Sequence, residues 1–224
     1  MCARRRSTNG STPTGGGASD GRVACRAATG AGADAGGAKV SRFAIPRRVP
    51  IHERPQEADD RSMFGHWEAD SVIGSGANLH TEVERKTRFL MARIIADKSA
   101  AASVGAQLEM FRALPAGARI SVTHDNGTEF ARHTRLRDEL GMATYFTDPY
   151  SSWQRASNEN RNGMIRRYLP KRCTIAMGMA REVQEIVDEI NNRPMRVLGY
   201  RTPAEAFVDE LVNLQVRQRC CTFN

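Results

Sequence analysis

The pattern of apolar and polar positions divides the chain into an N-terminal part with almost no large apolar side chains and a later part with regular patterns. Residues 1–38 consist mainly of Gly, Ala, Ser, Thr and Arg. Such a segment cannot bury enough surface to offset the entropy of ordering, so we expect a disordered tail. Residues 39–62 are basic and punctuated by prolines, which predicts an extended lead-in. We expect the folded domain at 63–212 and a C-terminal tail at 213–224.

Within the folded part, alternating and apolar runs predict five strands. They cover residues 66–74, 79–87, 88–96, 119–125 and 142–147. Three leading strands joined by short turns predict an antiparallel meander. The later alternation of helix and strand predicts parallel additions to the same sheet.

Helical spacing of apolar residues predicts helices between and after the later strands. Ser99 is a suitable N-cap for the first helix, and Gly141 is a suitable C-cap for the second, over 128–141. A third helix is expected over 179–194. A fourth is expected to begin at Thr202. This plan is an α/β fold, with a mixed five-stranded sheet flanked by helices. It fits a ribonuclease H-like fold, and the pattern alone leaves other mixed α/β folds open.

Charge and cysteine content narrow the class of protein. The chain has 33 basic and 25 acidic side chains, a net charge of +8, which favours a polyanionic partner. It contains no run of 18 apolar residues, so we expect no membrane span, and the N-terminal arginines precede no apolar signal region. The five cysteines form no CxxC pair and are odd in number, which predicts reduced thiols and a cytoplasmic protein.

Three acids occupy positions that suit a metal site. Asp70 lies inside the first strand, Asp125 ends the fourth strand before an Asn-Gly turn, and Glu159 lies on or near the helix after the fifth strand. In a ribonuclease H-like sheet the first and fourth strands are neighbours, so the three carboxylates would converge and require a divalent cation, Mg²⁺ or Mn²⁺. Two such ions about 4 Å apart can activate a hydroxyl and stabilise a leaving oxygen in phosphoryl transfer. Taken singly, each acid also fits an ordinary turn or surface role.

Other polar residues give weaker signals. Glu68 is an alternative first ligand, but Trp67, Ala69 and Ser71 would share the face opposite Asp70, which favours Asp70. Alternating charges on the first strands usually mark a solvated face, and we apply this interpretation to Glu68, Glu82, Glu84 and Asp97. Four of the five histidines are considered as zinc ligands, and they lack i, i+4 partners, so they predict no zinc site; they are His66, His80, His124 and His133.

Five sequence blocks together resemble a known family. The blocks are GHWEADSVIG, VERKTRFLM, THDNGTEFA, DPYSSWQRASNENRNGMIRRYLPK and NNRPMRVLGYRTPAEAF. They are similar to the catalytic domain of bacterial insertion-sequence transposases of the IS30 type, a group of DDE recombinases with an integrase catalytic core. The resemblance covers roughly residues 40–212. It matches the family's three catalytic and metal-binding acids to Asp70, Asp125 and Glu159, with 33 residues between the last two.

The resemblance implies an activity, a cofactor and partners. Family members cleave double-stranded DNA at the terminal inverted repeats of their element and join the exposed 3′ ends to target DNA. The chemistry uses Mg²⁺ or Mn²⁺, with two ions expected per site. The resemblance also implies a homo-oligomer assembled on DNA. A bacterial, nucleoid-associated location follows.

Polar and basic residues around Glu159 are candidates for DNA contact. A tryptophan can stack on an unpaired base, asparagines can bond phosphate or sugar oxygens, and arginines and lysines can bind phosphates. The candidates are Trp153, Gln154, Arg155, Asn158, Asn160, Asn162, Arg166, Arg167, Lys171 and Arg172.

One departure from the family leaves alternatives open. Full-length members carry an N-terminal helix-turn-helix region, and residues 1–38 match nothing of that kind. We therefore also consider a truncated, catalytically inactive DNA-binding remnant that modulates an intact transposase. A ribonuclease H-type nuclease acting on RNA in hybrids is a third alternative.

Overall fold

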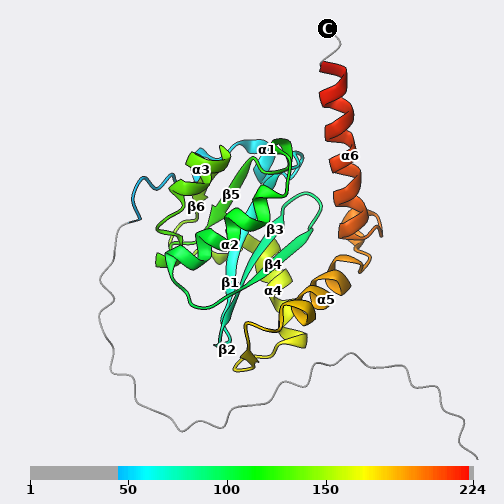
Figure 1. Cartoon of the computed structure of the whole chain (residues 1–224). Helices are drawn as coiled ribbons and strands as arrows, with labels where there is room; N and C mark the ends of the chain where they lie inside the picture. Colours follow the sequence, from blue (N-terminus) through cyan, green and yellow to red (C-terminus); the bar gives the residue numbers. More distant parts are fainter. Residues whose placement is uncertain (1–44, 222–224) are drawn as a thin grey trace, which may run out of the picture.

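The computed structural model describes residues 45–221 and contains the expected mixed sheet (Figure 1). Its five strands run in the order β4-β3-β1-β5-β6. β1 is antiparallel to β3, and β3 is antiparallel to β4, whereas β5 is parallel to both β1 and β6. The strands are β1 (His66–Val72), β3 (Asn78–Glu84), β4 (Leu90–Ile95), β5 (Ser121–His124) and β6 (Ala143–Phe146). Both the antiparallel meander and the parallel additions are confirmed.

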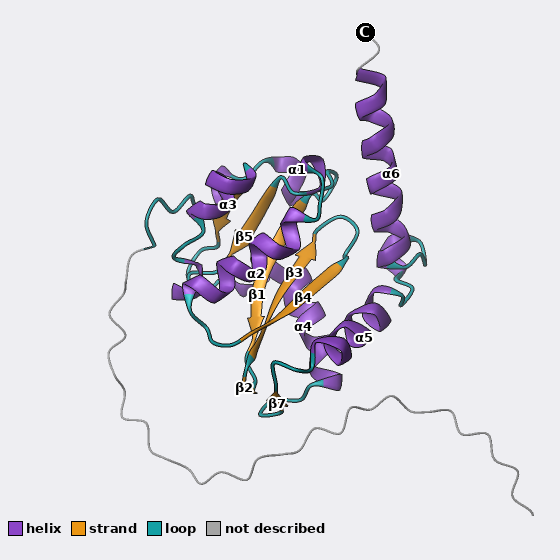
Figure 2. Cartoon of the chain, viewed as in Figure 1, coloured by secondary structure: helices purple, strands orange, loops and turns teal. Residues whose placement is uncertain are grey.

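Helices cover both faces of this sheet (Figure 2). The α-helices are α1 (Gln56–Asp59), α2 (Ala100–Arg112), α3 (Thr134–Leu140), α4 (Ala156–Tyr168), α5 (Ala180–Asn191) and α6 (Pro203–Cys221). The 3₁₀ turns are η1 (Ile51–Glu53), η2 (Ala116–Ala118), η3 (Thr128–Phe130), η4 (Ser152–Arg155) and η5 (Arg196–Leu198). Two short strands that the sequence did not predict, β2 (Ser75–Gly76) and β7 (Thr174–Ile175), pair in parallel.

Local sequence explains where the helices begin and end. The Ser99 hydroxyl accepts a hydrogen bond from the Ala102 amide over 3.2 Å, which caps α2 as expected. Gly141 ends α3 in the left-handed conformation with φ 69°, also as expected. The helix predicted over 128–141 is shorter, because its first residues form the separate turn η3, whose Phe130 is buried.

Two cores form, one on each face of the sheet. On one face Trp67 of β1 packs edge-to-face against Phe111 of α2. On the other face Val83 of β3 belongs to a cluster with residues of α4 and α5. All seven residues of β3 are therefore buried.

The double burial corrects the expectation of a solvated face on the first strands. Glu68, Glu82 and Glu84 are all buried, each at 0% exposure, and only Asp97 is exposed. A sheet covered on both faces leaves no solvated side for alternating charges, so these glutamates need partners inside the protein.

The segments flanking the domain also differ from expectation. The lead-in contains η1 and α1, and it buries Ile51 and Ala58 against the domain. Helix α6 continues past the boundary expected at residue 212 and projects away from the sheet (Figure 1). The expected tail at 1–38 lies outside the described residues.

Two further findings bear on the composition-based expectations. No helix within residues 45–221 combines the length and the apolar character needed to cross a bilayer. Cys173 is disulfide-bonded, so the expectation of reduced thiols is wrong for this residue.

Candidate active site

Asp70 and Asp125 lie side by side at the carboxyl ends of two central strands. β1 and β5 pair in parallel, with His66 opposite Ser121 and Glu68 opposite Thr123. Continuing this register brings Asp70 level with Asp125, which directly follows β5. Their side chains are 28% and 33% exposed, so both are reachable from solvent.

Arg155 connects these two carboxylates. Its Nη1 lies 3.4 Å from Asp70 Oδ1, and its Nη2 lies 3.2 Å from Asp125 Oδ2. Nη1 also donates to the Ala69 carbonyl over 2.8 Å. The guanidinium is 11% exposed and supplies the positive charge that two adjacent carboxylates require.

Neighbouring groups orient each carboxylate separately. Asp70 accepts a hydrogen bond from Asn162 Nδ2 over 2.9 Å and one from the Ser71 amide over 2.8 Å. Asp125 Oδ1 accepts from the Gly127 amide over 2.9 Å. The carboxylates are therefore held in place by the protein itself.

Gly127 also has a steric role in the turn after β5. A Cβ on this residue would lie 2.2 Å from Glu129 Oε2. Glu129 is buried and pairs with Lys98 over 2.9 Å. The Asn-Gly turn thus leaves room for a buried carboxylate beside Asp125.

Several neighbouring groups act on the pKa of Asp125. Burial raises the pKa of Asp125, and the nearby Arg155 guanidinium and the Gly127 amide act in the opposite direction. Glu129 and Asp70 add a smaller upward contribution to the pKa of Asp125. A cation placed between the aspartates would favour the ionised form of Asp125.

Glu159, the third expected acid, lies in the first turn of α4 and is exposed. It follows Arg155 by four residues and precedes Asn162 by three, a spacing that places the three residues along one side of the helix. Within residues 45–221 no group of three or more His, Cys, Asp or Glu side chains is arranged to hold a metal ion. The structure thus brings Asp70 and Asp125 together and leaves Glu159 outside their direct contacts.

The site nevertheless fits a divalent cation. A guanidinium already stands between the two carboxylates as a cation, and the surrounding donors are carboxylate oxygens, which Mg²⁺ and Mn²⁺ prefer. Asp70 and Asp125 would hold the ion.

A buried network fastens α4 to the sheet behind the site. Glu68 pairs with Arg85 and accepts a hydrogen bond from the Asn158 amide over 2.9 Å. Asn158 Nδ2 donates to the Glu68 carbonyl over 2.6 Å. Glu68 is thus fully engaged within the protein, which leaves Asp70 as the acid of β1 that faces the site.

Asn158 requires a correction. We expected it to contact DNA, but its side chain is fully buried and bonded to Glu68 and Thr81. The side chain points toward the sheet, so it has no polar atom open to a nucleic acid.

The other expected DNA contacts fall into two groups. Some are engaged within the protein: Gln154 exchanges hydrogen bonds with Asp148, and Arg166 donates to the Ile73 carbonyl over 2.7 Å. Others are exposed, and Trp153 has 72% of its surface exposed. The remaining exposed candidates are Asn160, Arg167, Lys171 and Arg172.

Arg155 and Asn162, which we expected to contact DNA, bond to the aspartates inside the protein. Their spacing from Glu159 along α4 was the available signal, because residues at i, i+4 and i+7 share one side of a helix.

A second buried network lies on the opposite face of the sheet, beneath Asp125. Gln107 of α2 donates to Glu82 over 2.7 Å and lies 2.9 Å from His124 Nε2. His80 Nε2 lies 2.8 Å from Glu82 Oε1. Burial lowers the pKa of His124 well below its ordinary value, with His133 and His80 contributing, so this ring is neutral. The network ties the end of β5 to α2.

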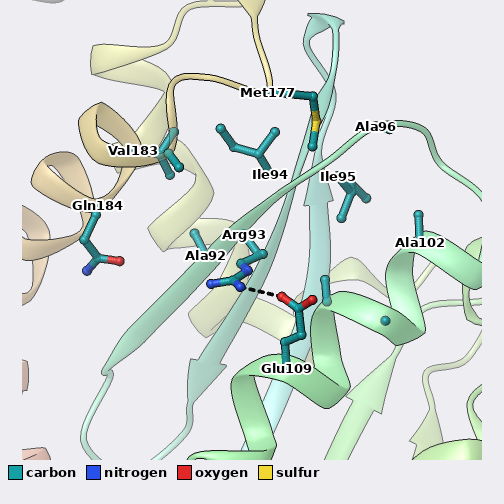
Figure 3. A pocket seen from close by; sticks show the side chains of 13 residues that line it. Ala92, Arg93, Ile94, Ile95, Ala96, Ala102, Glu109, Met177, Val183 and Gln184 are labelled. Carbon is teal, nitrogen blue, oxygen red and sulfur yellow. Dashed lines mark ion pairs between the residues drawn. The ribbon is translucent and has the colours of Figure 1, made fainter.

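A groove of about 530 Å³ lies elsewhere, along the edge strand β4 between α2 and α5 (Figure 3). The ion pair between Arg93 and Glu109 crosses it. Neither aspartate lines this groove, so it is separate from the candidate active site.

Comparisons with known proteins agree with this geometry. The Integrase core domain family matches residues 60–152. The catalytic core domain of BIV integrase superposes with a TM-score of 0.52 at 16% identity, covering 65% of this chain and 95% of that one, which shows a shared fold.

Three insertion-sequence proteins are similar in sequence. The transposase InsI of IS30C from Escherichia coli K12 is 40% identical over 162 residues, covering 72% of this chain and 42% of that protein. The transposase of IS1086 from Cupriavidus metallidurans is 37% identical, covering 75% and 50%. The transposase of IS4351 from Bacteroides fragilis is 37% identical, covering 77% and 53%. The chain spans about half the length of these relatives.

The fold is that of an integrase core, with a ribonuclease H-like sheet. Within that class, the sequence similarity is to mobile-element enzymes. Over about three quarters of its length the chain is similar to IS30-type insertion-sequence transposases.

Proposed function

We propose that this chain is the catalytic part of a DDE transposase that cleaves and joins DNA at the ends of an insertion sequence. The observation that carries the proposal is the pairing of Asp70 and Asp125 around one cation, at the carboxyl ends of adjacent strands. Glu159 completes the acid set from α4. The substrates would be double-stranded DNA carrying terminal inverted repeats and a target DNA, in a bacterial cytoplasm.

The residues have distinct roles in this proposal. Asp70, Asp125 and Glu159 would hold Mg²⁺ or Mn²⁺, with two ions expected per site. The bound ions would activate a water or 3′-hydroxyl oxygen and stabilise the leaving oxygen. Asn162 and Gly127 orient the aspartates through the hydrogen bonds described above.

The exposed residues around α4 would hold the DNA strand. Trp153 can stack on a base that leaves the duplex, and Arg167 and Lys171 can bind phosphates along the same helix and the loop that follows it. A homo-oligomer assembled on DNA would bring two element ends together. An inactive remnant is not favoured, because the three acids are present and the relatives are transposases.

The test compares wild type with Glu159→Gln in nicking supercoiled plasmid and in joining a pre-cut 3′-hydroxyl oligonucleotide to it, with Mn²⁺. Wild type should perform both reactions, and Glu159→Gln should lose both while keeping its circular dichroism spectrum. Glu185→Gln is the matched control, because Glu185 is an exposed glutamate of α5. Equal activity in wild type and Glu159→Gln would refute the role of Glu159.

A further inference from the structure

Arg155 stands where a divalent cation would bind. Its two terminal nitrogens lie 3.4 Å from Asp70 Oδ1 and 3.2 Å from Asp125 Oδ2. A Mg²⁺ ion bound to such oxygens stays at about 2.0–2.1 Å from them. A guanidinium and a divalent cation at the same pair of oxygens would repel each other at close range.

The contacts of Arg155 with the carboxylates of Asp70 and Asp125 are long for charged pairs. Hydrogen bonds between guanidinium and carboxylate groups usually measure about 2.7–2.9 Å. Both distances here are longer, and Arg155 Nε is buried without a hydrogen-bond partner in the described part of the chain. An unsatisfied buried donor costs free energy, which the bond to the Ala69 carbonyl and the charge of the two carboxylates offset.

Arg155 stands at the start of helix α4. The residue lies at the junction between the turn η4 and helix α4, with φ −121° and ψ 37°, outside the helical region. A change of its side-chain rotamer would break the contacts with Asp70, Asp125 and the Ala69 carbonyl and would need no change in the backbone of α4. The adjoining Trp153 is exposed, so a released guanidinium would enter the surface on which DNA is expected.

We propose that Arg155 is an internal substitute for the divalent cation: it neutralises Asp70 and Asp125 in the metal-free protein and leaves them when the metal binds. This inference rests on the proposed function only in placing the metal between the two aspartates. The site therefore has two states. In one the Arg155 guanidinium contacts both aspartates, and in the other the aspartates bind the metal and the site can accept a DNA phosphate.

The first experiment measures Mn²⁺ binding to metal-free protein by electron paramagnetic resonance, without DNA. Arg155→Gln should bind Mn²⁺ roughly tenfold more tightly than wild type, because the metal no longer displaces a guanidinium. A tenfold change in affinity corresponds to about 1.4 kcal/mol. Arg181→Gln removes the same formal charge from an exposed site on α5 and should leave the Mn²⁺ affinity unchanged. Equal or weaker Mn²⁺ binding by Arg155→Gln would overturn the inference.

Thermal unfolding supplies a second measurement. In a chelator, Arg155→Gln should melt below wild type because the aspartates lose their cation, and saturating Mn²⁺ should raise its melting temperature by more than it raises that of wild type. In the Asp70→Asn background, Arg155→Gln should lower the melting temperature in chelator by less than it does in wild type, since one of the two carboxylates has already been replaced by a neutral amide. A metal-induced rise no larger than that of wild type would contradict the exchange.

A measurement on wild type covers the case in which Arg155→Gln fails to fold. The NMR signal of the Arg155 Nε–H group should shift during a Mg²⁺ titration and saturate with the metal affinity of the protein. An unchanged signal at saturating Mg²⁺ would refute the exchange. A wild type that shows the exchange but cleaves no DNA would support the inference and contradict the proposed function, so the two failures are distinguishable.

Discussion

Asn162 of α4 donates a hydrogen bond to Asp70 of β1 over 2.9 Å, which joins the helix carrying Glu159 to the strand carrying the first aspartate. The amide oxygen of Asn162 also lies 3.0 Å from the hydroxyl of Thr81 on β3. One side chain thereby sets the position of α4 over two strands.

Replacing Asn162 should therefore slow plasmid nicking while changing the free energy of unfolding only modestly. Asn162→Ala removes the bond to Asp70 and should reduce the rate of plasmid nicking, while the free energy of unfolding falls by about 1 kcal/mol. Urea denaturation and initial nicking rates measure the two effects. Asn192→Ala, at the exposed end of α5, is the control and should leave the rate unchanged. A wild-type nicking rate in Asn162→Ala would contradict the positioning role.

Asn158 and Asn160 form a matched pair on α4 with opposite expected effects. Asn158→Ala leaves the buried carbonyl of Glu68 without its donor and should lower the free energy of unfolding by about 1–3 kcal/mol. Asn160→Ala changes an exposed side chain and should alter stability by less than about 0.5 kcal/mol, but it should weaken DNA binding. Urea denaturation and a fluorescence anisotropy assay with duplex DNA would separate the two.

The network beneath Asp125 should respond strongly to loss of Gln107. Gln107→Leu fills similar space but removes one of the two buried partners of Glu82 and the amide beside His124, so the free energy of unfolding should fall by about 1–3 kcal/mol. Glu109→Leu, on the exposed side of the same helix, is the control, since its ion pair with Arg93 is more than half exposed. Equal stability loss in the two variants would argue against a special role for the network.

His66 should make the protein sensitive to acid. Burial, with Arg54 and Arg85, lowers the pKa of His66 to about 4 from 6.5. The unfolded chain therefore binds the proton more tightly, and stability present above pH 6.5 should be lost as the pH falls toward 4, by about 3 kcal/mol in total. His66→Gln should flatten the pH dependence of the free energy of unfolding across this window. His52→Gln, at an exposed histidine, should not.

The sequence predicted the five strands of the main sheet and the two acids that Arg155 joins, because both depend on local pattern. The alternation around Asp70 indicated the face it shares with Glu68, and the Asn-Gly turn placed Asp125 at a strand end. The burial of Glu82 was not predictable from alternation, because helices cover both faces of this sheet and alternation alone does not reveal the second layer.

The role of Arg155 was hidden for a different reason. Composition around Glu159 suggested a surface for DNA, and an arginine in such a surface is expected to bind phosphate. Its bonds to Asp70 and Asp125 depend on how α4 docks on the sheet, and that docking rests on the buried bonds of Asn158. Long-range contacts of this kind are not encoded in any short motif.

The close approach of Gly127 to Glu129 sets an order in which the two positions can change during evolution. A methyl group at 127 must displace the buried carboxylate of Glu129, which pairs with Lys98. Shortening Glu129 first would open the space, so the same glycine replacement would be harmful in one genetic background and mild in the other. The turn beside Asp125 therefore creates epistasis between two residues that lie only two positions apart.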